Sequence, residues 1–380
     1  MQVSGLSRIT PASEHAARLE RVRAAMVAAE LETLICFGDV SHTANTRYFT
    51  DFRPVNGFNG IQRALLTIRL GREPVLFVAE ACLEHAQSMT SFAVRPFRAF
   101  TAAVQDVPPR VGLAGATHIP AQLLDQIRGH FPEWHLLPTD ALARVMAVKS
   151  AWEVARIAEA ARLTGAAYAA MESLVAAGEE VTERDLARAA DGAMIAAGAD
   201  GPAFLSMVQA GERSAFCSAL PTDGPVRPGD VLRLDVGARY GTHVADVART
   251  ITIGEVGAAG DDVVDASVRA VQAGLDVLRP GMTAGTLSEA IRSVLHERGY
   301  GDHSEEAKGR GAGNGIGMDA AEELPWIGPD HAAVLEPGMV FTLRASVCKP
   351  GVGGARTGRI VHVRESGFEV LDDLPMRLRW

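Results

Sequence analysis

The sequence has few cysteines, few aromatic residues and no long apolar run. The four cysteines show no Cys-x-x-Cys spacing, which excludes a zinc knuckle and a disulfide framework; they are Cys36, Cys82, Cys217 and Cys348. No segment reaches membrane-spanning length without charge, and residues 1–8 lack the apolar stretch of a secretory signal. We therefore expect a cytoplasmic protein, whose cysteines remain reduced in the cell.

The sequence also has no block of lysine and arginine, and its formal net charge is -9. Both features argue against a nucleic-acid partner or an anionic membrane surface. Apolar residues make up 47% and charged residues 22%, which is typical of a globular protein. A chain of 380 residues predicts two domains, with small molecules or proteins as partners.

The pattern of elements changes near residue 145, so we predict domains at 1–145 and 146–380. The first part combines a helix over 14–31 with short apolar runs at 33–37, 64–68 and 74–77, a pattern that predicts an α/β domain. The second part opens with a capping box, Ser150 to Glu153, and a long alanine-rich helix. Another helix is expected from Thr182 to a glycine stop at Gly198.

The second part repeats itself. Segments 228–235 and 337–344 each start with Pro-Gly and continue as an apolar strand, ending at Asp235 and Arg344 respectively. A helix over 186–198 has a counterpart over 287–299. Two halves of helices and antiparallel strands would face each other across a central site, where ligands usually bind.

Several motifs resemble those of the creatinase, prolidase and aminopeptidase P family. The resemblance covers nearly the whole chain and implies an α/β N-terminal domain plus an α+β pita-bread C-terminal domain with an internal pseudo-twofold repeat. The motifs are Lys149-Ser150, Gly201-Pro202-Ala203-Phe204, Asp235-Val236-Gly237, Asp246-Val247-Ala248-Arg249-Thr250, Gly313-Asn314-Gly315-Ile316-Gly317, 335–341 and Gly353-Gly354-Ala355-Arg356.

Peptidases of that family bind two divalent metals with two aspartates, one histidine and two glutamates. Asp235 and Asp246 match the aspartates, eleven residues apart on strands expected to form a tight hairpin. The histidine position holds Asn314, and the glutamate positions hold Arg344 and Gly358 or a neighbour of Gly358. Two carboxylates and an amide facing a guanidinium do not offset about four positive charges, so we predict no metal and no cofactor. Arg344 would itself neutralise Asp235 or Asp246.

We favour a metal-independent enzyme similar to creatinase, which would cleave a C–N bond of a small guanidino or amino-acid-like substrate by acid-base hydrolysis or elimination. The predicted catalytic residues are Asp235, Asp246, His243 and Asn314. The predicted substrate-binding residues in the same domain are Arg344, Arg356 and Ser218. Ser218 stands where creatinase has an essential histidine, so the chemistry would differ from that of creatinase itself.

Two alternatives stay open. In one, the chain is a catalytically inactive binding or assembly protein, in which an Arg–Asp pair replaces the metals structurally. In the other, it is a metal-dependent Xaa-Pro peptidase.

The family resemblance also implies a homodimer, in which an N-terminal loop reaches the partner's pocket. The candidate contacts on that loop are Arg53, Phe58 and Arg63. Cys217 is interpreted as a buried structural thiol on a strand.

Overall fold

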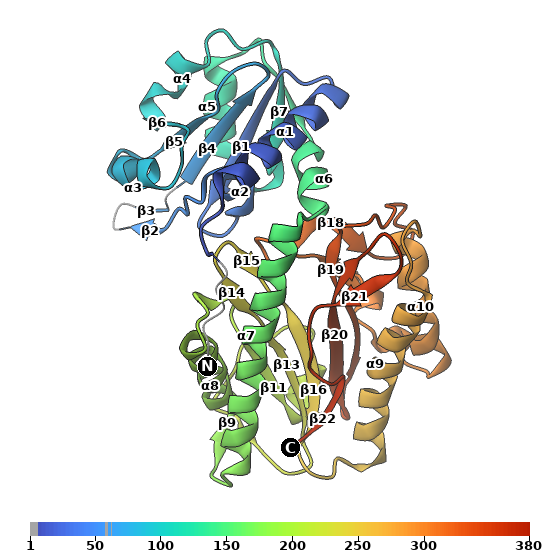
Figure 1. The fold of residues 1–380 in the computed structure, drawn as a ribbon. Helices are drawn as coiled ribbons and strands as arrows, with labels where there is room; N and C mark the ends of the chain where they lie inside the picture. The colour runs from blue at the N-terminus through green and yellow to red at the C-terminus, as the bar shows by residue number, and fades with distance from the viewer. Residues whose placement is uncertain (1–6, 58–59, 62) are drawn as a thin grey trace. The chain divides into compact units, whose positions relative to one another are not determined.

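The computed structural model describes residues 7–57, 60–61 and 63–380, so Phe58 lies outside the described residues. Within these ranges the chain forms two compact units, Ser7–Met146 and Ala147–Trp380 (Figure 1). No helix in the described ranges is long and apolar enough to cross a membrane.

The N-terminal unit is built on a six-stranded mixed sheet with the order β6-β5-β4-β1-β7-β8. The strands are β1 Thr33–Asp39, β4 Arg63–Arg69, β5 Val75–Val78, β6 Ala93–Pro96, β7 Arg110–Ala114 and β8 His135–Pro138, with a short ladder of β2 Asn56–Gly57 and β3 Gly60–Ile61. The helices are α1 Ala12–Ala28, α2 Ala44–Thr50, α3 Leu83–Ser88, α4 Phe100–Ala103, α5 Ala121–His130 and α6 Ala141–Ala147. Aromatic side chains such as Phe77 and Phe131 fill the core, and the unit is α/β as predicted.

The first half of the C-terminal unit begins at the predicted capping box, in which Ser150 and Glu153 cap each other's backbone N–H groups. Its helices are α7 Ala151–Ala176 and α8 Glu183–Ala196. Its four-stranded sheet consists of β11 Met207–Ala210, β13 Val231–Val236, β16 Val247–Thr252 and β22 Arg377–Arg379. Shorter ladders involve β9 Val181–Thr182, β10 Gly201–Pro202, β12 Pro225–Val226, β14 Ala238–Tyr240 and β15 His243–Val244.

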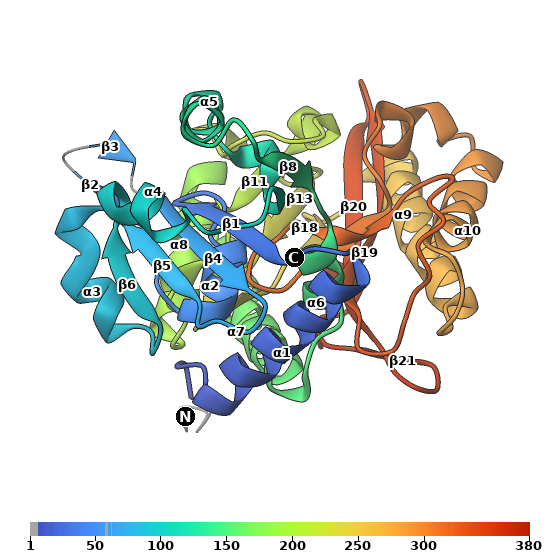
Figure 2. The same ribbon diagram turned by 90° about the horizontal axis from the view of Figure 1, so that it is seen from above.

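The second half has the same plan, with helices α9 Gly257–Val277 and α10 Ala284–Glu297. Its five-stranded sheet consists of β17 Gly313–Gly315, β18 Glu322–Ile327, β19 Val340–Lys349, β20 Gly353–Val363 and β21 Phe368–Val370. In this unit α7 and α8 lie beside the first sheet, and α9 packs on β19 and β20 of the second (Figures 1 and 2). This is the expected pita-bread arrangement.

The predicted repeat extends to individual backbone hydrogen bonds. Gly229 and Gly338 both have positive φ, 95° and 91°, which explains why glycine follows proline at the start of each strand. The N–H of Gly229 donates to Ile253, and that of Gly338 donates to Val363, each over 2.8 Å. Asp235 and Arg344 therefore occupy equivalent places, on β13 and β19.

The expected hairpin between the two aspartates is wrong in detail. Asp235 lies on β13 opposite Ala248 of β16. Asp246, however, precedes β16. The segment between the two aspartates contains β14 and β15, which form a separate small sheet with β10. Asp246 therefore lies just before β16 and not within the β13–β16 ladder.

Candidate functional site

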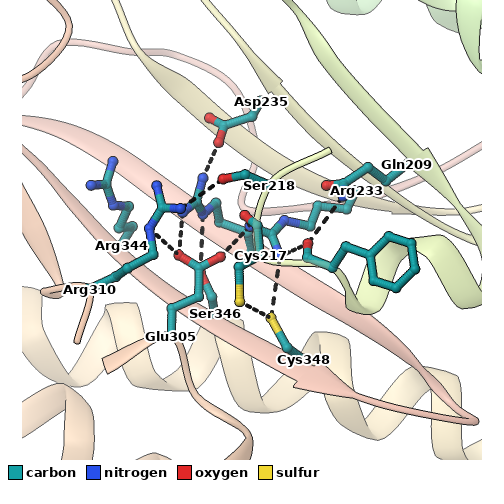
Figure 3. A network of polar contacts seen from close by, with 12 residues as sticks. Gln209, Cys217, Ser218, Arg233, Asp235, Glu305, Arg310, Arg344, Ser346 and Cys348 are labelled. Carbon is teal, nitrogen blue, oxygen red and sulfur yellow. Dashed lines mark hydrogen bonds and ion pairs between the residues drawn. The ribbon is translucent and has the colours of Figure 1, made fainter. Parts of the chain in front are cut away.

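A network of buried charges lies where the two sheets of the C-terminal unit meet (Figure 3). The first half supplies carboxylates and one arginine, and the second half supplies two arginines and one glutamate. The residues are Arg233, Asp235, Asp246, Glu305, Arg344 and Arg356.

Arg356 is the centre of the network and is only 2% exposed. Its Nη1 donates to Asp235 Oδ2, its Nη2 donates to Glu305 Oε2, and its Nε donates to Ser346 Oγ over 3.1 Å. The guanidinium is thereby used within the protein rather than presented to solvent. Arg356 lies on β20, opposite Ser346 of β19, so strand register positions the pair.

Arg344 makes the second contact between the halves. Its Nη1 lies 3.3 Å from Asp246 Oδ2, and its Nη2 donates to Asn314 Oδ1. The Asn314 amide is oriented by its own Nδ2, which donates to the carbonyls of Gly315 and Ala320, each over 2.9 Å. Of the two carboxylates that the sequence offered to Arg344, the structure selects Asp246.

Gly358 is the residue directly opposite Arg344 in the β19–β20 ladder. A Cβ atom at this position would lie 3.2 Å from Ala248 Cβ and 3.6 Å from Arg344 Cβ. The glycine therefore leaves room for the base of the Arg344 side chain. A glutamate here would need its neighbours to move.

Glu305 connects the network to its rim. Its carboxylate accepts from Arg233 and Arg356, both nearly fully buried, and lies 3.7 Å from Arg310 Nε. Arg310, with 43% of its side chain exposed, also donates from Nη1 to Ser218 Oγ over 2.7 Å. Ser218 thus belongs to the edge of the network, as a hydrogen-bonding residue.

Neighbouring charges shift the carboxyl groups in opposite directions. Burial raises the pKa of Asp246 to about 7, and repulsion from Asp235 adds to that rise. Burial would also raise the pKa of Glu305, but Arg356 and Arg233 hold it at about 2. Burial lowers the pKa of Arg344, and repulsion from Arg356 lowers it further. A proton at Asp246 therefore relieves the repulsion between the two aspartates.

Glu306, the neighbour of Glu305, gives a pH prediction. Burial raises the pKa of Glu306 to about 7, and its Oε2 atom has no hydrogen-bond partner in the described part of the chain. A carboxyl with a raised folded-state pKa stabilises the fold below its unfolded value and loses that contribution as pH rises toward 7. Between about pH 4.5 and 7, the free energy of unfolding of the wild type should therefore decline by an amount on the order of 1 kcal/mol, a figure reduced for partial solvent screening. We expect Glu306→Gln to abolish this decline.

The matched control is Glu305→Gln, which should keep the decline in the free energy of unfolding between about pH 4.5 and 7. Glu305 has a lowered pKa, so its contribution is present at neutral pH and is lost only in acid. Urea unfolding of the wild type and both variants across this pH range measures the difference. Parallel pH curves for wild type and Glu306→Gln would contradict the prediction.

His243, predicted as a catalytic residue, lies in a buried pocket against α7. Its Nδ1 is 2.9 Å from Thr242 Oγ1, its Nε2 is 3.6 Å from Glu153 Oε1, and its ring packs edge-on against Trp152. These contacts suit a structural histidine. A catalytic role for His243 stays a prediction.

The predicted contacts on the N-terminal unit lie in different surroundings. Arg53 is exposed, and Arg63 begins β4 at the edge of a hollow of about 460 Å³ that Phe97, Phe100 and Phe131 also line. Their place in a partner subunit's pocket stays a prediction.

Sequence reasoning missed Arg233 and Glu305. The sequence did contain a signal for Arg233, because a charged residue inside the apolar run 231–234 must be paired if the strand is buried. In the structure Arg233 is only 1% exposed. Glu305 carried none, since it lies in an irregular segment between two short 3₁₀ turns, Gly301–His303 and Glu306–Lys308.

Glu305 also belongs to a group that sequence spacing did not indicate. Its carboxylate and the thiols of Cys217 and Cys348 lie within 4.8 Å of one another. Among the residues that the structure describes, this is the one group of three or more such ligand atoms. In the same described part of the chain, Asp235 and Asp246 do not form such a group with a third ligand.

The fold, the two aspartates and the matched sequence pattern agree with one family. The sequence model of metallopeptidase family M24 matches residues 155–365, more than half of the chain. This chain belongs to metallopeptidase family M24. The M24 pattern thus spans both halves of the repeat and all six charged residues of the network.

Relatives within M24 are named as peptidases. An Xaa-Pro dipeptidase of Pyrococcus furiosus is 26% identical over 355 residues, covering 90% of this chain and 97% of the relative. A probable dipeptidase PepE of Mycobacterium tuberculosis is 30% identical over 280 residues, covering 70% and 72%. The crystal structure of dipeptidase PepE from Mycobacterium ulcerans covers 98% of this chain and 99% of its own, with a TM-score of 0.84 and 26% identity.

These findings overturn the predicted creatinase-like, metal-independent hydrolase or lyase. The relatives are named Xaa-Pro dipeptidases and dipeptidases. The prediction failed because it inferred a reaction from lost metal-ligand positions, and a missing ligand identifies no replacement chemistry. Of the readings kept open, the Xaa-Pro peptidase is the one that the names of the relatives favour.

Proposed function

We propose that this M24 protein binds small peptides in the charged centre of its C-terminal unit and lacks the dinuclear metal hydrolysis of the family's peptidases. The observation that carries the proposal is Arg344, whose buried Nε has no hydrogen-bond acceptor among the described residues. A guanidinium with a free donor suits a peptide carboxylate.

The pair Asp235 and Asp246 would bind the ammonium group of such a ligand. Repulsion from Asp235 contributes to the raised pKa of Asp246. An ammonium group placed beside the two carboxylates would relieve the repulsion between them, as protonation of Asp246 also does. A small peptide in its zwitterionic form carries both required groups. The names of the relatives supply the same ligand class.

The residues do not fit a dinuclear metal centre. The cluster already balances three carboxylates, on Asp235, Asp246 and Glu305, against three guanidinium groups, on Arg233, Arg344 and Arg356. Two divalent ions would add four positive charges without a new anion. Two further ligand positions of the family hold Asn314 and Gly358 or a neighbour of Gly358, and these residues offer no carboxylate or imidazole. We therefore derive no step through a metal.

A second candidate is a metal-dependent Xaa-Pro dipeptidase, which the names of the relatives favour. This function would require metal ions to displace Arg344 from Asp246 and Arg356 from Asp235.

One experiment distinguishes the two candidates. Xaa-Pro dipeptides and Ala-Ala are titrated calorimetrically into the protein with EDTA, and product release is followed in parallel with Mn²⁺ or Co²⁺. We expect binding in EDTA, no release of free proline with either metal, and affinity at least about 10-fold weaker in Arg344→Lys, which keeps the charge but loses the planar fork.

Arg364→Lys is the matched control, since Arg364 is half exposed and pairs with Glu369 at the surface; its affinity should equal that of the wild type. Metal-dependent proline release would replace the proposal with the second candidate. Absence of binding for every dipeptide would reject the proposed ligand class.

A further inference from the structure

Two cysteines from opposite halves of the C-terminal unit face each other beside the charged network (Figure 3). The Sγ atoms of Cys217 and Cys348 are 3.8 Å apart, although the residues are separated by 131 positions in sequence. Cys348 is buried on β19, while Cys217 is half-buried in the loop after a 3₁₀ turn, Gly211–Ala215. The interpretation of Cys217 as a buried strand residue is therefore wrong.

The backbone on both sides of this pair is held in place. Arg233 donates to the carbonyls of Phe216 and Cys217 over 3.0 and 2.9 Å, which fixes the loop. Cys348 lies on the same face of β19 as Arg344 and Ser346, because alternate residues of a strand share a face. A disulfide needs the two sulfur atoms to approach from 3.8 Å to about 2.05 Å, and Cys217 lies in a loop outside any strand.

The neighbouring charges favour thiol chemistry over metal binding at this pair. Glu305 would be the third metal ligand, but its two oxygens already accept from Arg233 and Arg356. Arg233 Nη1 also lies 3.5 Å from Cys348 Sγ. A metal cation bound here would be repelled by the Arg233 guanidinium beside Cys348 Sγ. It would also have to displace the hydrogen bonds that Glu305 accepts from Arg233 and Arg356.

We propose that Cys217 and Cys348 form a reversible disulfide that ties the 216–218 loop to β19 under oxidising conditions. With hydrogen peroxide as the oxidant, the Cys217 thiolate attacks one peroxide oxygen, giving a sulfenic acid and one water. The Cys348 thiol then attacks that sulfur as its proton passes to the departing hydroxide, which leaves as a second water. Two thiols and one peroxide become one disulfide and two waters, and a dithiol reductant reverses the change.

Exposure sets the order of the two steps. Cys217 is the more accessible thiol, whereas burial raises the pKa of Cys348 to about 11 and keeps it protonated. Cys217 is thus oxidised first and Cys348 resolves it. The disulfide would restrain Ser218 and its hydrogen bond to Arg310 at the rim of the network. Disulfide formation does not rest on the proposed peptide binding.

The test uses the full-length reduced protein treated with stoichiometric hydrogen peroxide, followed by thiol counting after denaturation and peptide mapping. We expect the loss of two of the four thiols, a peptide cross-link between positions 217 and 348, an upward shift in Tm, and recovery of all thiols with dithiothreitol. Cys217→Ser and Cys348→Ser should each prevent the cross-link. Cys36→Ser and Cys82→Ser, both in the N-terminal unit, should form it as the wild type does.

Three results would overturn the inference. One is four free thiols after peroxide treatment of the wild type. Another is stable oxidation of Cys217 to sulfinic acid without a cross-link. The third is retention of stoichiometric zinc by the reduced protein, lost in Cys217→Ser, which would make the group a metal site.

Discussion

Replacing Arg356 with methionine should lower the free energy of unfolding by about 3 to 5 kcal/mol, because two buried carboxylates lose their shared cation. Arg356 is the residue to which both Asp235 and Glu305 are paired, at 5% and 4% side-chain exposure. Methionine keeps most of the side-chain length, so loss of charge and hydrogen bonds dominates over loss of volume. Urea unfolding at neutral pH measures the effect.

Arg364→Met is the appropriate control, since Arg364 comes directly after β20 and pairs with Glu369 while 54% exposed. Exposed pairs contribute about 1 kcal/mol or less. If the two variants lose similar stability, the buried network is not a major stabilising feature of this fold.

The second large effect is expected near the C-terminal end, at Asp372. This carboxylate accepts from Arg249, which is fully buried, and from Arg359 over 2.7 Å, while its Oδ2 accepts from the backbone N–H of Ile360 over 3.0 Å. Asp372→Ala would leave the Arg249 charge buried without its carboxylate. We expect a loss of about 3 to 5 kcal/mol.

Asp373 provides a control one residue away, because its side chain is exposed. Asp373→Ala should change the unfolding free energy by about 0.5 kcal/mol or less. Thermal or urea unfolding of both variants gives the comparison, and equal losses would show that the Asp372–Arg249 pair contributes little.

Much of the fold was predictable because its signals are local. Ser150 and Glu153 form a capping box from adjacent turns, and Gly229 and Gly338 mark the start of β13 and β19 through a backbone conformation that glycine favours. The repeat was visible because both halves use these same local signals. Strand order and register came from the structure and not from the sequence.

The site was predictable only in part, because its contacts are tertiary. The sequence identified Asp246, Arg344 and Asn314 as neighbours through the family motifs, and the structure joins them by direct contacts. Glu305 escaped prediction, since an irregular segment has no periodicity from which a side-chain direction follows. The pairing of Asp235 with Arg356 likewise depends on how the two sheets approach each other.

The two repeated strands place side chains of opposite charge at corresponding positions of the two halves. Asp235 pairs with Ala248 across one ladder, and Arg344 pairs with Gly358 across the other. Two residues before Ala248 is Asp246, and two before Gly358 is Arg356. At corresponding positions, the first half therefore carries anions and the second carries cations.

Two copies of the first half would bring four carboxylates together, and two copies of the second would bring together four guanidinium groups. Like charges at close range oppose either self-association, whereas the observed pairs join unlike halves. The charges at these corresponding positions therefore favour contact between the two unlike halves over contact between two copies of the same half.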